Sequence, residues 1–125
     1  MAFIVDYVLD AALSKLDTEA NALYITSQES STYTSATSTH ALGVKTNLTV
    51  SAPTDRTPNG RKVTVAQFSD GSVTATGTAT HYAIVDTVAQ RLLATGSLAQ
   101  PQVVTSGNIF SLADMDIGIA DATSV

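Results

Sequence analysis

The chain of 125 residues contains no cysteine and no tryptophan. Without cysteine it has no disulfide framework, no zinc–thiolate site and no thiol nucleophile. The same absence leaves the compartment open, because a cysteine-free domain folds in oxidising and in reducing surroundings. Without tryptophan, an aromatic platform for a sugar would need tyrosines that lie far apart in the sequence, at Tyr7, Tyr24, Tyr33 and Tyr82.

Charged residues are also scarce. They make up 14% of the chain, and 11 acidic residues stand against 6 basic ones. Binding to a phosphate backbone needs clustered cations, yet only Arg56, Arg61 and Lys62 lie close together, so we expect no nucleic-acid partner. No apolar run approaches the length of a membrane span, and the N-terminus lacks the basic start of a secretory signal. We therefore expect no membrane association.

Threonine and serine are, in contrast, abundant. Threonine suits solvent-facing strand positions, because its branched Cβ fits the pleat and its hydroxyl group binds water. A surface made neutral in this way relies little on charge for solubility. Such a surface is also easily buried against another protein, which favours a role in assembly.

The length predicts one domain, residues 1–125, with a core that needs no disulfide or metal. Residues 1–20 are expected to form a helical segment, because apolar residues recur there at spacings of three and four. One interpretation, which we favour, packs this helix on its own sheet. The other makes it an arm that docks on a neighbouring subunit. Phe3, Ile4 and Tyr7 keep that second interpretation open, because they are more apolar residues than one narrow stripe on a helix needs. They are our candidate contacts to another subunit or to a capsid.

Residues 21–125 show short runs of small and β-branched residues between turn signals, which is typical of consecutive antiparallel strands. The expected strands are 22–27, 45–51, 62–68, 72–86, 91–96, 102–105, 109–112 and 114–120. The segments 28–40, 52–60 and 96–101 are expected to be loops, Asp70-Gly71 a tight turn, and Gly77 a bulge or bend. About eight strands is the usual number for a two-sheet sandwich. We therefore predict a mainly β fold: an antiparallel β-sandwich or jelly-roll-like domain with an N-terminal α-helix.

His40 and His81 are the only histidines. A metal site needs three or four convergent ligands, and nothing at ligand spacing accompanies either residue. His40 falls in the Ser/Thr-rich loop, and His81 falls in the middle of an expected strand, where we expect it at the rim or partly buried. We predict no metal site and no cofactor.

Asp114 and Asp116 would point to the same face of a strand. Paired carboxylates serve glycoside hydrolysis or Ca²⁺ binding, but no acidic or aromatic groove accompanies this pair. A solvated strand face is the favoured interpretation. The chain also lacks a Gly-x-Ser-x-Gly elbow and a glycine-rich phosphate loop. We predict no catalytic residue and no enzymatic activity; a cell-wall hydrolase acting through the two aspartates is the weakest of three hypotheses.

Several short motifs in order carry a family resemblance. The run Gly71–Asp86, with its Gly-Thr-Ala-Thr-His strand, resembles small structural proteins of tailed bacteriophages and prophages. The same likeness extends to Tyr7-Val-Leu-Asp-Ala-Ala-Leu, Gly60-Arg-Lys-Val, Arg91-Leu-Leu-Ala-Thr-Gly, Val104-Thr-Ser-Gly-Asn and Met115-Asp-Ile-Gly-Ile. It touches most of the chain and is tightest from Gly60 onward. These motifs are structural, so they indicate a family rather than an activity.

The resemblance implies a virion component, made in the bacterial cytoplasm and placed on the capsid exterior. It implies a head decoration (cement) protein whose partner is the major capsid protein, and a homo-oligomer, with a trimer matching local three-fold positions. A tail or fibre-associated module that binds a receptor or glycan is the alternative. The resemblance supplies no catalytic residues.

Overall fold

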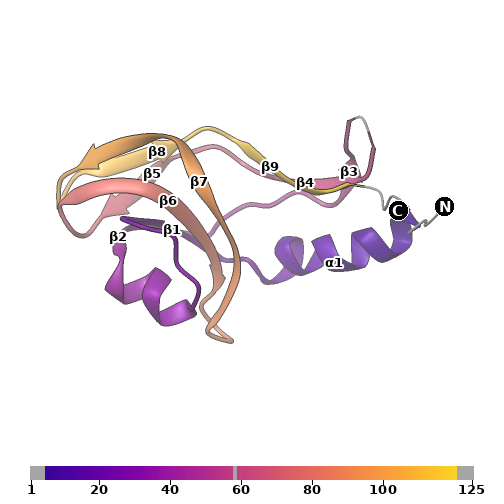
Figure 1. The fold of residues 1–125 in the computed structure, drawn as a ribbon, viewed down its shortest axis with the longest axis horizontal. Coiled ribbons are helices and arrows are strands. Elements are labelled where there is room, and N and C mark those ends of the chain that lie inside the picture. Colours follow the sequence, from indigo (N-terminus) through magenta and orange to yellow (C-terminus); the bar gives the residue numbers. More distant parts are fainter. Residues whose placement is uncertain (1–4, 58, 121–125) are drawn as a thin grey trace.

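The computed structural model describes residues 5–57 and 59–120. The molecule is elongated: a curled sheet forms one end, and a helix with a smaller sheet forms the other (Figure 1). The helix α1 spans Asp6–Glu19, and one turn of π-helix, η1, spans Ser35–Thr39. The strands are β1 (Ala22–Thr26), β2 (Ala41–Thr46), β3 (Thr54–Asp55), β4 (Arg61–Val65), β5 (Phe68–Val73), β6 (Gly77–Asp86), β7 (Arg91–Val104), β8 (Ile109–Leu112) and β9 (Met115–Ile119).

The larger sheet has six strands in the order β7-β6-β1-β2-β5-β8, and every neighbouring pair is antiparallel. It curls into a half-barrel, so that its two edge strands, β7 and β8, approach each other (Figure 1). The smaller sheet has the order β3-β4-β9. The prediction of a mainly β, antiparallel, sandwich-like fold with an N-terminal helix is therefore confirmed.

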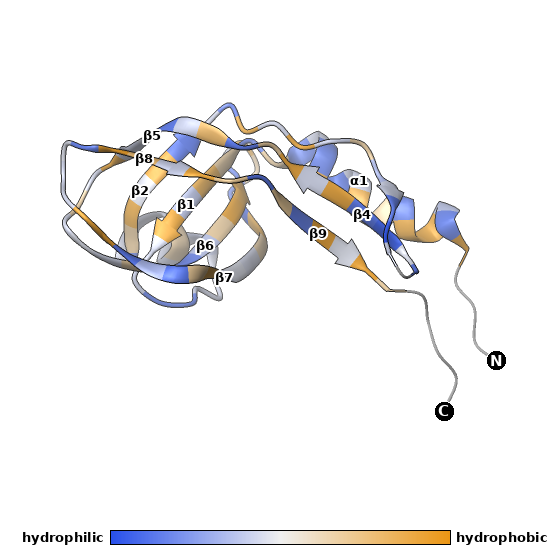
Figure 2. Cartoon of the chain, turned by 90° about the horizontal axis from the view of Figure 1, so that it is seen from above, coloured by the Kyte–Doolittle hydropathy of each residue, from blue (hydrophilic) through white to orange (hydrophobic). Residues whose placement is uncertain are grey.

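Two strand pairs join the sheets into one ribbon. β4 pairs with β9 in the small sheet, and β5 pairs with β8 in the large one. β4 leads into β5 after two residues, and β8 leads into β9 after two residues. The ribbon thus runs along the molecule from the half-barrel to the helix end (Figure 2). The ladder pairing is interrupted between the sheets, at residues 66–67 and 113–114, where both chains cross from one sheet to the other.

The helix packs on its own sheet, as the favoured interpretation predicts. Leu9, Leu13 and Leu16 are the buried residues of α1, and the helix lies against β4. Leu13 and Leu16 belong to one core cluster with Val63 and Val65 of β4. That cluster continues into the half-barrel through Leu23, Ile25 and Ile84, so both ends of the molecule share one hydrophobic core.

A salt-bridge cluster fastens the helix to the small sheet. Arg61 on β4 donates from Nε to Asp10 Oδ1 of α1 at 2.7 Å and from Nη2 to Asp10 Oδ2 at 3.2 Å. Its Nη1 donates to Asp55 Oδ1 on β3. Hydrogen bonds from the guanidinium to both carboxylates raise the pKa of Arg61. Paired, planar contacts of this kind fix the geometry on both sides of the arginine.

Because lysine cannot reproduce the fork of Arg61, the Arg61→Lys variant is expected to loosen α1 specifically. Amide hydrogen exchange should become several-fold faster in α1 and β3, while the amides of β1 and β6 keep their protection. Arg91→Lys is the matched control, since Arg91 Nη1 lies 3.6 Å from Glu19 Oε1 and the Arg91 side chain is largely exposed. Equal acceleration throughout the protein, or none in α1, would contradict the role of Arg61.

Several sequence-based predictions in the β region are wrong. The expected strand 72–86 is divided between β5, which ends at Val73, and β6, which begins at Gly77, and the expected loop 52–60 contains β3. The expected strand 45–51 lies instead at Ala41–Thr46, and it ends because Asn47 has a φ of 54°. Asp70-Gly71 is not a turn but part of β5, and the expected loop 96–101 belongs to the continuous strand β7. At Gly71 an added Cβ would lie 2.5 Å from the Phe110 ring, and at Gly96 it would lie 2.5 Å from Tyr82 Oη. These two glycines make room for aromatic side chains rather than turning the chain.

Candidate functional site

The two histidines make short-range hydrogen bonds at the end of β1. Gln28 Nε2 lies 2.9 Å from His40 Nε2, so this ring nitrogen accepts. The Thr80 hydroxyl donates to the carbonyl of Ser27, and His81 Nδ1 lies 2.8 Å from the same hydroxyl. His81 is half-buried on β6, as expected. Within residues 5–57 and 59–120, no group of three or more histidines or carboxylates is placed to hold a metal ion.

The two aspartates of the C-terminal segment do not act as a pair. Asp114 precedes β9, whereas Asp116 lies within it. Asp116 accepts hydrogen bonds from Lys62 Nζ and from the Thr64 hydroxyl of β4, both at 2.8 Å. These bonds from Lys62 and Thr64 lower the pKa of Asp116. The carboxylate joins β9 to β4 on an exposed face, which agrees with the interpretation as a solvated strand face.

The lowered pKa of Asp116 predicts a small, signed pH dependence. A carboxyl group whose pKa is lower in the folded than in the unfolded state stabilises the fold above its unfolded pKa, and this contribution disappears as the pH falls through the folded pKa. Half of the Asp116 side chain is exposed, so the contribution is at most about 1 kcal/mol. Urea unfolding of the wild type and of Asp116→Asn should therefore differ at pH 6 and converge as the pH falls below about 4. A difference that is constant with pH would refute this assignment.

The tyrosines form no common platform. Tyr24 and Tyr33 pack against one small cluster, whereas Tyr82 packs against the main core. Burial raises the pKa of Tyr24, and the nearby Tyr33 adds to this shift; burial likewise raises the pKa of Tyr82. Tyr7, on the helix, is 83% exposed. The ring arrangement thus gives no specific support to a glycan site.

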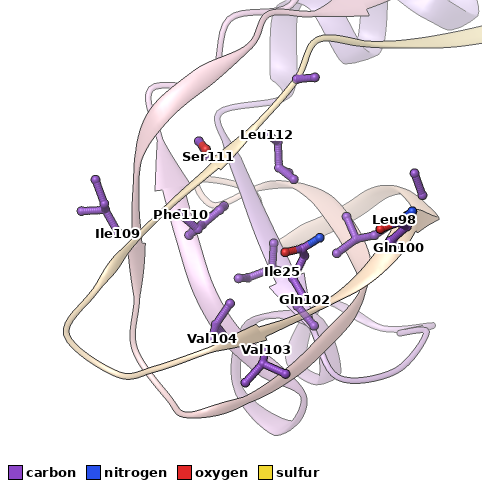
Figure 3. A pocket seen from close by; sticks show the side chains of 13 residues that line it. Ile25, Leu98, Gln100, Gln102, Val103, Val104, Ile109, Phe110, Ser111 and Leu112 are labelled. Atoms are coloured by element: carbon purple, nitrogen blue, oxygen red, sulfur yellow. The ribbon is translucent and has the colours of Figure 1, made fainter.

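A cavity opens where the two edges of the half-barrel face each other. Its volume is about 520 Å³, which lies within the range of ligand-binding clefts. The walls come from β7 and β8, and Ile25 of β1 and Ala79 of β6 form the floor. Figure 3 shows the side chains that point into it, Leu98, Gln102, Val104, Phe110 and Leu112. None of the 13 residues that line the cavity is charged.

Among residues 5–57 and 59–120, the two strands that form the walls of this cavity have a free edge each. β7 pairs with β6 on one side, and β8 pairs with β5 on one side. Phe110 is held against Phe68 in an edge-to-face contact with ring centroids 5.5 Å apart. Val103 and Ile109 point away from the cavity and are 82% and 73% exposed. We call this cavity, with its two free edges and its exposed rim, the seam.

A second apolar surface lies at the opposite end of the molecule. Val5, Tyr7 and Val8, at the start of α1, are 47%, 83% and 52% exposed. Val5 and Val8 lie on an exposed face of the helix together with Ala12, whereas Leu9, Leu13 and Leu16 are buried. Of the three candidate contact residues, Tyr7 is exposed here, and Phe3 and Ile4 lie outside the described residues.

The seam was not foreseen from the sequence. The alternation of Ile109-Phe-Ser-Leu predicts a strand with one inward face, and this strand is present. No local signal shows that β7 and β8 become the two edges of one curled sheet, because that placement depends on pairings across the whole chain.

No helix in the described part of the chain has the length and apolar character of a membrane-spanning helix. Comparison of the chain with protein-family models, with curated proteins and with solved structures gave no match.

Proposed function

We propose that the protein is a structural component of a tailed-phage virion, a head decoration protein that binds the major capsid lattice from outside and stabilises it. The order of structural motifs along the chain, which resembles small virion proteins, supports this role. The observation that carries it in three dimensions is the presence of exposed apolar side chains at both ends of the molecule, Val103 and Ile109 at one end and Val5, Tyr7 and Val8 at the other; Figure 2 shows how far the molecule extends between these ends. A protein that joins neighbours in a lattice needs two such separate contact surfaces.

The chemistry of the surface supports the same role. Few side chains are charged, and the solvent-facing strand positions are rich in hydroxyl groups. Burying such groups against another protein avoids the large desolvation penalty of burying charges. One hydrophobic core cluster connects the two ends of the molecule that carry these surfaces. A pre-ordered module of this kind loses little conformational entropy on binding, and repetition over a lattice multiplies a modest contact.

Co-sedimentation with heads assembled without this protein tests the proposal. Purified full-length protein should pellet with the heads and saturate at a fixed ratio to the major capsid protein. Because the contact is expected to be uncharged, raising the salt from about 0.05 to 0.5 M should weaken binding only slightly, whereas an electrostatic contact would weaken steeply. Tails purified from the same particles are the control.

The outcomes separate the alternatives. Binding to heads and not to tails supports the decoration role. Binding to tails alone, together with hits on a glycan array, would replace it with a tail-associated receptor module. Failure to bind either structure would refute a place in the assembled virion.

A further inference from the structure

We propose that the seam is a self-association site, which takes the N-terminal segment Met1–Val5 of a second copy of this chain as an added strand along β8. This inference goes beyond capsid binding, because it assigns an occupant from the chain itself to the cavity. Extended peptides commonly add to free sheet edges, where main-chain hydrogen bonds give affinity and side-chain pockets give specificity. The seam offers such an edge together with such a pocket.

The chemistry of the segment matches that of the cavity. Met-Ala-Phe-Ile-Val carries no charged side chain, and the cavity lining carries none either. Along a strand, alternate side chains point to opposite faces. The segment therefore presents Phe3 and Val5 on one face, and Ala2 and Ile4 on the other. Either face offers apolar groups to a cavity whose inward wall includes Val104, Phe110 and Leu112.

The length of the segment also fits the edge. β8 contains four residues, Ile109–Leu112, and Ala2–Val5 are four residues. Gln102, on the opposite wall, points its side-chain amide group into the cavity. This amide can donate to and accept from the main chain of an added strand. The seam thus holds apolar contacts, a free edge and one adaptable polar group.

The occupant must come from another molecule. α1 has 14 residues and is therefore about 21 Å long. It begins at the end of the molecule that lies away from the half-barrel (Figure 1). Four extended residues span at most about 14 Å, which is less than the length of the helix they would have to run back along. The segment therefore cannot reach the seam of its own chain.

The contact joins unlike surfaces, the start of one chain and the seam of the next. When such a contact is repeated from copy to copy, it forms a closed ring if the rotation between neighbouring copies adds up to a full turn. Otherwise it forms an open chain. The number of copies in a ring follows from the measured mass.

Mass measurement by light scattering on full-length protein, over a range of concentrations, is the first test. The wild type should associate, and Ile4→Asp and Gln102→Arg should each weaken association by at least about tenfold, because each places a charge in an uncharged contact. Val88→Asp and Gln90→Arg are the controls. They introduce the same charges at exposed positions on the β6–β7 turn, away from the seam. The proposal would be overturned if the wild type stays monomeric, or if both seam variants associate as strongly as the wild type.

Engineered cysteines give a second test that does not depend on charge. Because the chain has no cysteine, a protein with Ile4→Cys and a differently tagged protein with Gln102→Cys can be mixed and oxidised. The mixed disulfide should form in preference to either symmetric one, and replacing Gln102→Cys by Val88→Cys should abolish this preference. No preference for the mixed product would contradict the pairing, whatever the outcome of head binding.

Discussion

Replacing Ile84 by alanine is expected to lower the free energy of unfolding by about 2–5 kcal/mol. Ile84 lies on β6, is fully buried and belongs to the core cluster that both ends of the molecule share. Removing its side chain beyond Cβ eliminates apolar contacts and leaves a cavity that a close-packed sheet fills only partly. The free energy of unfolding of a small domain is only about 5–15 kcal/mol, so this single change is expected to remove a large part of it.

Ile109→Ala is the matched control, because it removes the same atoms from a side chain that is 73% exposed on β8. Its expected effect is about 1 kcal/mol or less, mostly from the lower strand propensity of alanine. Urea unfolding followed by circular dichroism distinguishes the two variants. A loss of about 3 kcal/mol lowers the midpoint by roughly 1–3 M urea at the slopes usual for small proteins. Equal midpoints for the two variants would contradict the placement of Ile84 in the shared core.

Gly60→Ala is expected to destabilise the protein by about 2–4 kcal/mol and to open the small sheet. Gly60 has a φ of 93°, and a Cβ there would lie 2.0 Å from the Ile119 carbonyl oxygen and 2.8 Å from Ala120 Cα. Both neighbours are backbone atoms, so no side chain can turn aside. The strain is therefore expected to disrupt the pairing of β4 with β9, because Gly60 directly precedes Arg61, which is paired with Ile119.

Gly107→Ala isolates the steric contribution. Gly107 has almost the same φ, 92°, but a Cβ there would meet nothing within 4 Å. This variant should therefore show only the conformational strain of an L-residue at positive φ, about 1–2 kcal/mol. Hydrogen exchange should rise in β4 and β9 for Gly60→Ala alone. If both alanine variants lower the free energy of unfolding by the same amount, the close approach of backbone atoms at Gly60 does not contribute to the destabilisation.

Local patterns predicted the elements whose neighbours are close in sequence. Leu9, Leu13 and Leu16 are buried on one face of α1, as their spacing indicates. The turn at 87–90 and the turn before Ile109 also lie where polar and glycine residues place them. Such features depend on hydrogen bonds and side chains within a few residues, so a single sequence contains the relevant information.

The wrong predictions share a different cause. Gly71 and Gly96 look like turn residues, but each is required by an aromatic ring from another strand, Phe110 and Tyr82. The seam likewise arises because β7 and β8 become the two edges of one curled sheet. These features depend on which distant strands pair, and local propensity contains no record of such pairing. Candidate contact residues were therefore sought on the helix alone, and the seam was missed.

Electron cryo-microscopy of the intact virion tests the proposed function most directly. The account predicts density for this fold on the outer surface of the head, repeated at equivalent positions of the capsid lattice and absent from heads assembled without the protein. Heads that carry no such density, with the protein found only on the tail or missing from the particle, would contradict it.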